Sequence, residues 1–242
     1  MEDAPLQMCG VLSHGRGKRM KRNVSLEEIS DGRLYSKNDM VKAGCGDCKG
    51  CSSCCRGMGN SVILDPYDIY RLTALMGSTF EELINGKIEL NVVDGVILPN
   101  LSMSNGSETC AFLNEQGRCS IHPYRPGICR LFPLGRYYEK EKRSFKYFLQ
   151  VHECPVPNKT KVKVEKWVDT PGLNRYEQFI CDWHYFLEDV EERIASETDD
   201  NTVKNINLFI LKLFFIMPYQ KDDFYGQFAA RMEQAKDVLD LG

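Results

Sequence analysis

The sequence lacks a strong charge bias and a long hydrophobic run, and each shortage excludes a class of protein. Its 31 Lys and Arg residues against 34 Asp and Glu give a formal net charge of -3 over 242 residues, which argues against a general nucleic-acid binder. The longest apolar stretch, residues 206–217, is interrupted by Lys212 and is shorter than the roughly 20 residues of a membrane helix. We therefore expect no membrane segment and no nucleic-acid partner.

The first residues also lack the features of a secretory signal peptide. Glu2 and Asp3 are acidic, no apolar core follows, and residues 15–22 form a basic run that we interpret as a solvated arm. We therefore expect a cytoplasmic protein. Thiols in that compartment stay reduced unless a metal holds them, and the total of eleven cysteines is odd, so a disulfide framework is not expected.

Cysteine is the residue type that the sequence has in excess. Five cysteines fall within the stretch CGDCKGCSSCC, which begins at Cys45, and four more follow at wider intervals. Each Cys-x-x-Cys step lets two thiolates converge on one metal, while backbone N–H groups of the turn donate to sulfur. The arrangement predicts a metal site built from a dense run and a dispersed second half.

The spacing bears on which metal is bound. Read from Cys45, it is Cys-x2-Cys-x2-Cys-x3-Cys, the step pattern of bacterial iron–sulfur ferredoxins, although Arg56 stands where those motifs have proline. Adjacent side chains such as those of Cys54 and Cys55 point in different directions, which makes two nearby sites plausible and leaves open whether there is one site or two. Eight thiolates exceed what one zinc ion uses, so we favour an iron–sulfur cluster, with zinc as the alternative.

Arginines lie beside several of the cysteines. A divalent ion with four thiolates carries a net charge of about -2, which is costly to bury without nearby donors. Arg56 and Arg130 each follow a cysteine directly, and we predict that they donate hydrogen bonds to the cofactor sulfurs. Arg118 is a weaker candidate because it occupies a predicted turn at Gly117. Arg125 and Arg130 flank Cys129.

The local pattern predicts an α+β fold, in which a small cysteine-rich metal-binding domain of short hairpins and helices precedes an α-helical C-terminal extension. Asp65-Pro66 marks a helix start and Gly77 its end, and Ser78 with Glu81 forms a capping box for the next helix. The expected strands cover 61–64, 88–93, 96–102, 135–138 and 144–151, and the expected helices cover 66–76, 79–84, 174–195, 203–217 and 224–241. We divide the chain into a loosely ordered lead-in (1–44), the cysteine-cluster domain (45–157) and the helical extension (158–242).

Two stretches together resemble a known family. The run from Cys48 to Cys55 and the segment CAFLNEQGRCSIHPYRPGICRLFPLG, which begins at Cys110, are similar to the YkgJ-type cysteine-cluster family, a zinc- or iron-chelating CxxCxxCC domain. The resemblance covers residues 48–154, under half of the chain. It implies a metal ion or cluster held by Cys48, Cys51, Cys54, Cys55, Cys110, Cys119, Cys129 and Cys154, with Cys45 as an addition outside the pattern.

The resemblance also opens a second function. The same domain occurs in flagellin lysine N-methylases, so an S-adenosylmethionine-dependent protein lysine N-methylase with a protein substrate is the alternative. The chain has no G-x-G-x-x-G turn, which a doubly wound cofactor-binding domain normally shows. We therefore expect a metal-binding protein with an electron-transfer or structural role and leave catalysis open.

Five further residues have weaker claims to chemistry. His122 and His152 lie near cysteines, but Pro123 follows His122 and favours an exposed or capping role. Cys181 and His184 share a helix face, for which a solvated polar surface is the expected explanation. Cys9 is expected to be a free thiol.

Overall fold

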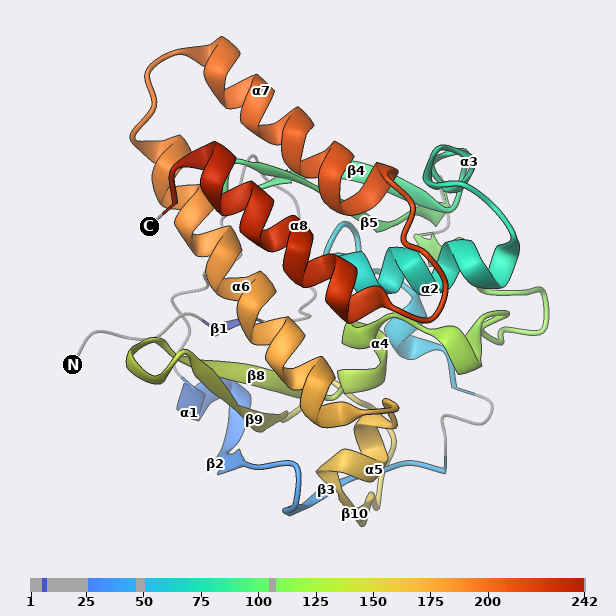
Figure 1. Cartoon of the computed structure of the whole chain (residues 1–242). Coiled ribbons are helices and arrows are strands. Elements are labelled where there is room, and N and C mark those ends of the chain that lie inside the picture. The colour runs from blue at the N-terminus through green and yellow to red at the C-terminus, as the bar shows by residue number, and fades with distance from the viewer. Residues whose placement is uncertain (1–5, 8–25, 47–50, 105–107, 242) are drawn as a thin grey trace.

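The computed structural model describes residues 6–7, 26–46, 51–104 and 108–241. Helix and strand are mixed, and the last third of the chain is helical (Figure 1), in agreement with the predicted α+β class. The strands are β1 (Leu6–Gln7), β2 (Ser30–Tyr35), β3 (Met40–Gly44), β4 (Ile88–Val93), β5 (Val96–Leu101), β6 (Met103–Ser104), β7 (Thr109–Cys110), β8 (Leu134–Glu139), β9 (Ser144–Gln150) and β10 (Thr160–Lys163). The α-helices are α1 (Leu26–Ile29), α2 (Pro66–Met76), α3 (Phe80–Ile84), α4 (Gly127–Leu131), α5 (Val164–Val168), α6 (Leu173–Ala195), α7 (Asp200–Leu211) and α8 (Phe224–Leu239).

The strands form one sheet of four and three pairs. The larger sheet has the order β1-β8-β9-β2, and the pairs are β10-β3, β4-β5 and β6-β7. Both predicted hairpins are confirmed, with Val93 opposite Val96 in one and Glu139 opposite Ser144 in the other. Positive φ angles at Asp94 (49°) and Gly95 (91°) give the first hairpin the tight two-residue turn that Asp-Gly favours. The predicted strand over 61–64 is reduced to an isolated bridge between Ile63 and Asn100.

Helix α2 begins and ends as predicted, whereas the start of α3 differs by one residue. The Asp65 side chain accepts from the backbone of Asp68 in a capping box, and Gly77 closes the helix in the left-handed conformation. The capping box of α3 uses Thr79 and Glu82 instead of Ser78 and Glu81. The reason is that the Ser78 N–H is already bonded to the Thr73 carbonyl at the end of α2.

Residues 30–35 and 40–44 form the strands β2 and β3, although the sequence predicts a loosely ordered lead-in over 1–44. Ser30 pairs with Gln150 and Met40 pairs with Lys163. Four of the six residues of β2 are exposed, so the segment is polar in composition although it lies in a sheet. The basic run at 15–22 and Cys9 lie outside the described residues.

The helices α6, α7 and α8 pack on the cysteine-rich region through one hydrophobic core. This core includes residues from Met58 in the cysteine region to Leu239 in α8. The predicted helix over 203–217 is α7 followed by a π-helical turn, η4 (Lys212–Ile216). The cysteine-rich region and the helical region share this core. The division into three domains stays a prediction.

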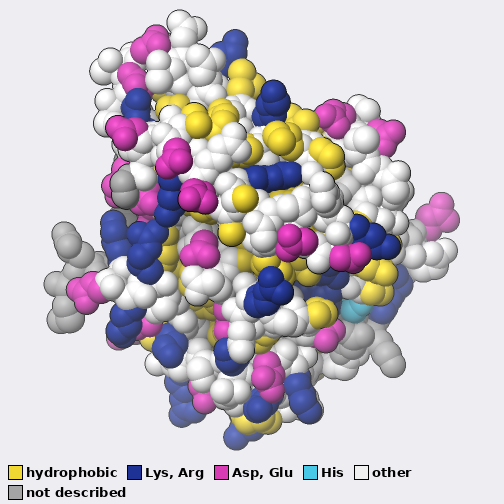
Figure 2. All heavy atoms as spheres, viewed as in Figure 1, with side chains coloured by type: hydrophobic (Ala, Val, Ile, Leu, Met, Phe, Trp, Pro, Cys, Tyr) yellow, Lys and Arg dark blue, Asp and Glu magenta, His cyan; other side chains and the backbone are white. Residues whose placement is uncertain are grey.

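The visible surface mixes charges of both signs. Figure 2 shows Lys and Arg interspersed with Asp and Glu over the face that carries the C-terminal helices. This agrees with the small net charge of -3. In the described part of the chain, no helix combines the length and apolar character needed to cross a membrane.

Candidate metal centre

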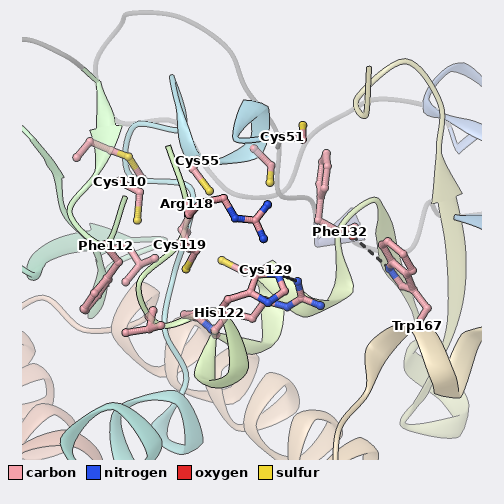
Figure 3. Close-up of a pocket in the computed structure, with 17 residues that line it drawn as sticks. Cys51, Cys55, Cys110, Phe112, Arg118, Cys119, His122, Cys129, Phe132 and Trp167 are labelled. Carbon is pink, nitrogen blue, oxygen red and sulfur yellow. Dashed lines mark hydrogen bonds between the residues drawn. The ribbon is translucent and has the colours of Figure 1, made fainter. Parts of the chain in front are cut away.

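Six cysteines from four separate segments line one pocket, which we call the cysteine pocket (Figure 3). Its free volume is about 70 Å³, several times what one water molecule needs. The cysteines are Cys51, Cys54, Cys55, Cys110, Cys119 and Cys129. The remaining lining residues are Val62, Leu101, Met103, Phe112, Arg118, Ile121, His122, Arg125, Pro126, Phe132 and Trp167.

Cys110 and Cys119 begin two matching turns. The carbonyl of Cys110 accepts from the Leu113 N–H at 2.8 Å, and that of Cys119 accepts from the His122 N–H at 3.3 Å. A bridge between Leu113 and Cys119 joins the turns. In each turn the backbone N–H two residues after the cysteine donates to its sulfur, which lowers the thiol pKa. Burial is the larger effect and leaves both pKa values raised, so these sulfurs have thiolate-stabilising donors in place within a partly buried setting.

Cys54 and Cys55 both line the cysteine pocket. They lie in the 3-10 turn η1 (Ser53–Cys55). A hydrogen bond from the Cys55 thiol to Cys54 lowers the pKa of Cys54 to about 7 and raises that of Cys55. The charges of Cys129 and Cys110 raise the Cys55 pKa further. Sulfurs from three segments of the chain therefore lie within electrostatic reach of one another.

The arginines of the pocket are not the two that the sequence favours. Arg118 and Arg125 line it, and Figure 3 shows the Arg118 guanidinium directed toward the cysteine side chains. The positive charge of Arg125 lowers the pKa of both Cys54 and Cys119. In the sequence, the only signal for Arg118 is its place directly before Cys119. The turn at Gly117 makes Arg118 a weak candidate in the sequence, yet in the structure Arg118 lines the pocket.

Arg130 and Arg56, which the sequence favours as donors to sulfur, have other partners in the structure. Arg130 is buried, and its Nε, Nη1 and Nη2 donate to the carbonyls of Arg125, Asp169 and Pro123. Arg56 is exposed and its Nε donates to the hydroxyl of Ser52 at 3.3 Å. Neither lines the pocket. The N–H groups of Arg130 are already bonded to backbone carbonyls. The spacing of residues in the sequence does not reveal these bonds.

His122 lines the pocket, whereas the sequence favours an exposed or capping role for it. It is half-buried and begins the 3-10 turn η2 (His122–Tyr124), with Pro123 following. Its Nε2 lies 2.7 Å from Nη1 of Arg125. Since a guanidinium only donates, this nitrogen is the acceptor. His122 thus orients Arg125 through Nε2, and this contact occupies the lone pair of that nitrogen.

The remaining predicted ligands lie elsewhere or outside the described residues. Cys45 directly follows β3, and Cys154 lies in the loop before β10; these strands pair at Gly44 and Thr160. Neither cysteine lines the pocket, and Cys48 lies outside the described residues. His152 is at a bend with a positive φ of 70° and is also outside the lining.

The polar face predicted around Cys181 is buried instead of solvated. Cys181 and Glu188 are 8% and 7% exposed. The His184 ring stacks on Tyr138 with 3.5 Å between centroids. Burial raises the pKa of Cys181 to about 11, so this thiol stays protonated and belongs to the packing between α6 and the sheet.

The cysteine pocket gathers sulfur donors without closing a coordination shell. Among the described residues, no three Cys, His, Asp or Glu side chains form a group that could already hold a metal ion. The donor chemistry nevertheless fits zinc or iron, because soft thiolates select zinc and iron–sulfur clusters.

The comparison with family models matches the same part of the chain. The CxxCxxCC model, described as "Putative zinc- or iron-chelating domain", covers residues 47–155. Residues 47–155 are therefore similar to the CxxCxxCC family. This confirms the resemblance seen in the motifs, over slightly less than half of the 242 residues. The CxxCxxCC domain contains all six cysteines of the pocket and excludes Cys45 and Cys181. No curated protein and no solved structure matches the chain.

Proposed function

We propose that the CxxCxxCC domain binds zinc or an iron–sulfur cluster through the cysteine pocket. The observation that carries this proposal is that six thiols from four segments line one pocket. Cysteines that serve packing alone are distributed through a core, as Cys181 is on α6. A concentration of thiols in one cavity instead matches the donor set of a thiolate metal centre.

Charge supports the same conclusion. A divalent ion with four thiolates has a net charge of about -2, which needs nearby donors or counter-charges when it is buried. Arg118 and Arg125 in the lining supply two positive charges, and the N–H groups of Phe112 and Ile121 donate to sulfur. The same two guanidinium groups disfavour the entry of a lysine ammonium group. We therefore favour metal binding over lysine methylation as the role of this pocket.

Cys110, Cys119 and Cys129 are the ligands best placed to act with the pair Cys54 and Cys55. They line the same pocket, and their sulfurs lie close enough for the charge of one to raise the pKa of another, as Cys129 and Cys110 do for Cys55 and Cys54 does for Cys119. Zinc bound there would tie four segments together, whereas an iron–sulfur cluster would also supply one-electron redox chemistry. One zinc ion and one iron–sulfur cluster each take four cysteines, so the number of thiols does not separate them. The ferredoxin-like spacing of the run that begins at Cys45 is the reason that we favour the cluster. Two of the six thiols in the pocket would then be spare or serve a second metal.

Anaerobic purification followed by elemental analysis and an absorption spectrum tests the proposal. We expect either iron with acid-labile sulfide and visible absorption, or colourless protein with stoichiometric zinc. Cys119→Ser should lose most of the metal, and Cys181→Ser is the matched control, since that buried thiol lies outside the pocket. Wild-type protein without stoichiometric metal, or equal metal loss in both variants, would refute the proposal.

A further inference from the structure

Helix α2 holds both ends of a short segment that enters the cysteine pocket. At one end, Oδ1 of Asp68 accepts a hydrogen bond from the Gly127 N–H at 2.8 Å. At the other end, Nη2 of Arg71 donates to the Pro123 carbonyl at 3.1 Å. Asp68 and Arg71 are three residues apart on α2, which places them on the same helix face. One face of α2 therefore holds the segment 123–127 at both ends, through the carbonyl of its first residue and the N–H of its last.

The held segment carries groups of the pocket. Arg125 lies in its middle and is the guanidinium whose charge lowers the pKa of Cys54 and Cys119. Gly127 is the first residue of α4, which carries Cys129. Neither Asp68 nor Arg71 lines the pocket itself. Their influence on a bound metal must therefore pass through the backbone that positions Arg125 and Cys129.

The contact between α2 and Gly127 leaves little freedom. Asp68 is 3% exposed, and its Oδ2 accepts from the Asp65 N–H at 3.3 Å in the capping box of α2. On its other side, Gly127 lies against Tyr176 of α6, where a Cβ atom would approach the Tyr176 hydroxyl to 1.9 Å. The backbone at Gly127 is thus held between a buried carboxylate and a buried aromatic ring.

The Pro123 end has a second donor. Arg130, on α4, also donates to the Pro123 carbonyl, and it donates to the Arg125 carbonyl at 3.2 Å. Hydrogen bonds from charged donors are about twice as strong as neutral ones. Segment 123–127 is therefore held by side chains of two helices, with α2 supplying contacts at both ends.

We propose that Asp68 and Arg71 are positioning residues of the metal centre, which hold segment 123–127 so that Arg125 and Cys129 face the bound metal. This inference rests on the proposed metal-binding function. Hydrogen-bonding groups outside the ligand shell commonly change metal affinity 10- to 100-fold when they are removed. We expect a loss of that size from each of the two side chains.

The test measures Co²⁺ and Zn²⁺ binding by the full chain under anaerobic conditions. Affinity is measured by competition with a chelator, and the Co²⁺ absorption spectrum reports the ligand geometry. Arg71→Met and Asp68→Ala should weaken binding about 10- to 100-fold and shift the Co²⁺ bands, while Arg71→Lys, which keeps a donor, should retain more affinity than Arg71→Met. A change in folding stability alone does not shift the Co²⁺ bands of the bound form.

Arg231→Met is the matched control. The Arg231 guanidinium also donates to three carbonyls, those of Leu213, Met217 and Pro218, but far along the chain from the pocket residues. It should leave Co²⁺ affinity and spectrum unchanged.

The outcomes separate this inference from the proposed function. If wild-type protein binds neither metal, both fail. If wild-type protein binds metal and folded Arg71→Met keeps wild-type affinity and spectrum, or if Arg231→Met loses as much affinity, only the positioning role is refuted. If Asp68→Ala does not fold, the comparison of Arg71→Met with Arg231→Met decides the question.

Discussion

Gly127 offers a prediction in which two known effects have opposite signs. It is the first residue of α4 and its φ is not in the left-handed region. On helix propensity alone, Gly127→Ala should therefore stabilise the fold by about 0.5–1 kcal/mol. Sterically, the new Cβ would lie 1.9 Å from the Tyr176 hydroxyl oxygen and 3.2 Å from its Cζ.

The steric effect should dominate. Tyr176 is 2% exposed, so its ring cannot move aside without disturbing the core. Overpacking of this kind costs about 1–3 kcal/mol, and we expect Gly127→Ala to lower the free energy of unfolding by that amount. Tyr176→Phe removes the clashing oxygen, which has no hydrogen-bond partner among the described residues, and should be close to neutral alone.

The assay is urea unfolding at fixed metal concentration, followed by the fluorescence of the two tryptophans. In the double variant, Tyr176→Phe should restore at least about 1 kcal/mol of the loss, within the range seen for residues in contact. The reasoning is refuted if Gly127→Ala is as stable as the wild type or more stable. It is also refuted if the two substitutions are additive.

Three further predictions follow from particular contacts. In metal-free protein, alkylation of Cys54 by iodoacetamide should have its midpoint near pH 7, since the thiolate is the nucleophile, and Cys55→Ala should move it upward by removing the donated hydrogen bond; peptide mapping that finds one midpoint in both proteins contradicts this. Asn207→Ala should lower the free energy of unfolding in urea by about 2–4 kcal/mol, because the Asn207 side chain accepts from the Ile97 N–H at 2.6 Å and donates to the Gly95 carbonyl at 3.1 Å. Asn205→Ala, at an exposed position of the same helix, is the control, and an equal loss in both variants would contradict the prediction. Chelation of the metal should lower the thermal midpoint of unfolding, because a ligand at a thousand times its Kd stabilises the fold by about 4 kcal/mol. Differential scanning calorimetry measures the midpoint, and a midpoint that the chelator leaves unchanged would contradict metal binding by the folded protein.

Elements with local signals were predictable from the sequence. The ends of α2 follow from an N-cap at Asp65 and a left-handed Gly77, and the β4–β5 turn follows from Asp94-Gly95. Strand β2 was missed because its order comes from pairing with β9, more than a hundred residues away, as in Ser30 with Gln150. Its own residues are mostly exposed and carry no hydrophobic alternation.

In the candidate site, the cysteines were predictable from the sequence and the roles of the arginines were not. Cysteine spacing indicated a metal site because ligand spacing is a property of the local chain, and six of the predicted ligands meet in one pocket. The direction of an arginine side chain depends on the fold around it. Arg130 donates hydrogen bonds to the carbonyls of Pro123 and Asp169, whereas Arg118, in the turn before Cys119, lines the pocket.

The central claim is that sulfur atoms of the cysteine pocket bind a metal, and X-ray absorption spectroscopy at the metal edge of the anaerobically purified protein tests it most directly. The account predicts a shell of sulfur ligands, at about 2.3 Å if the metal is zinc, with an additional iron–iron distance if it is a cluster. In Cys119→Ser this sulfur shell should shrink or disappear. A metal surrounded only by oxygen and nitrogen, or a sulfur shell that Cys119→Ser leaves intact, would contradict the account.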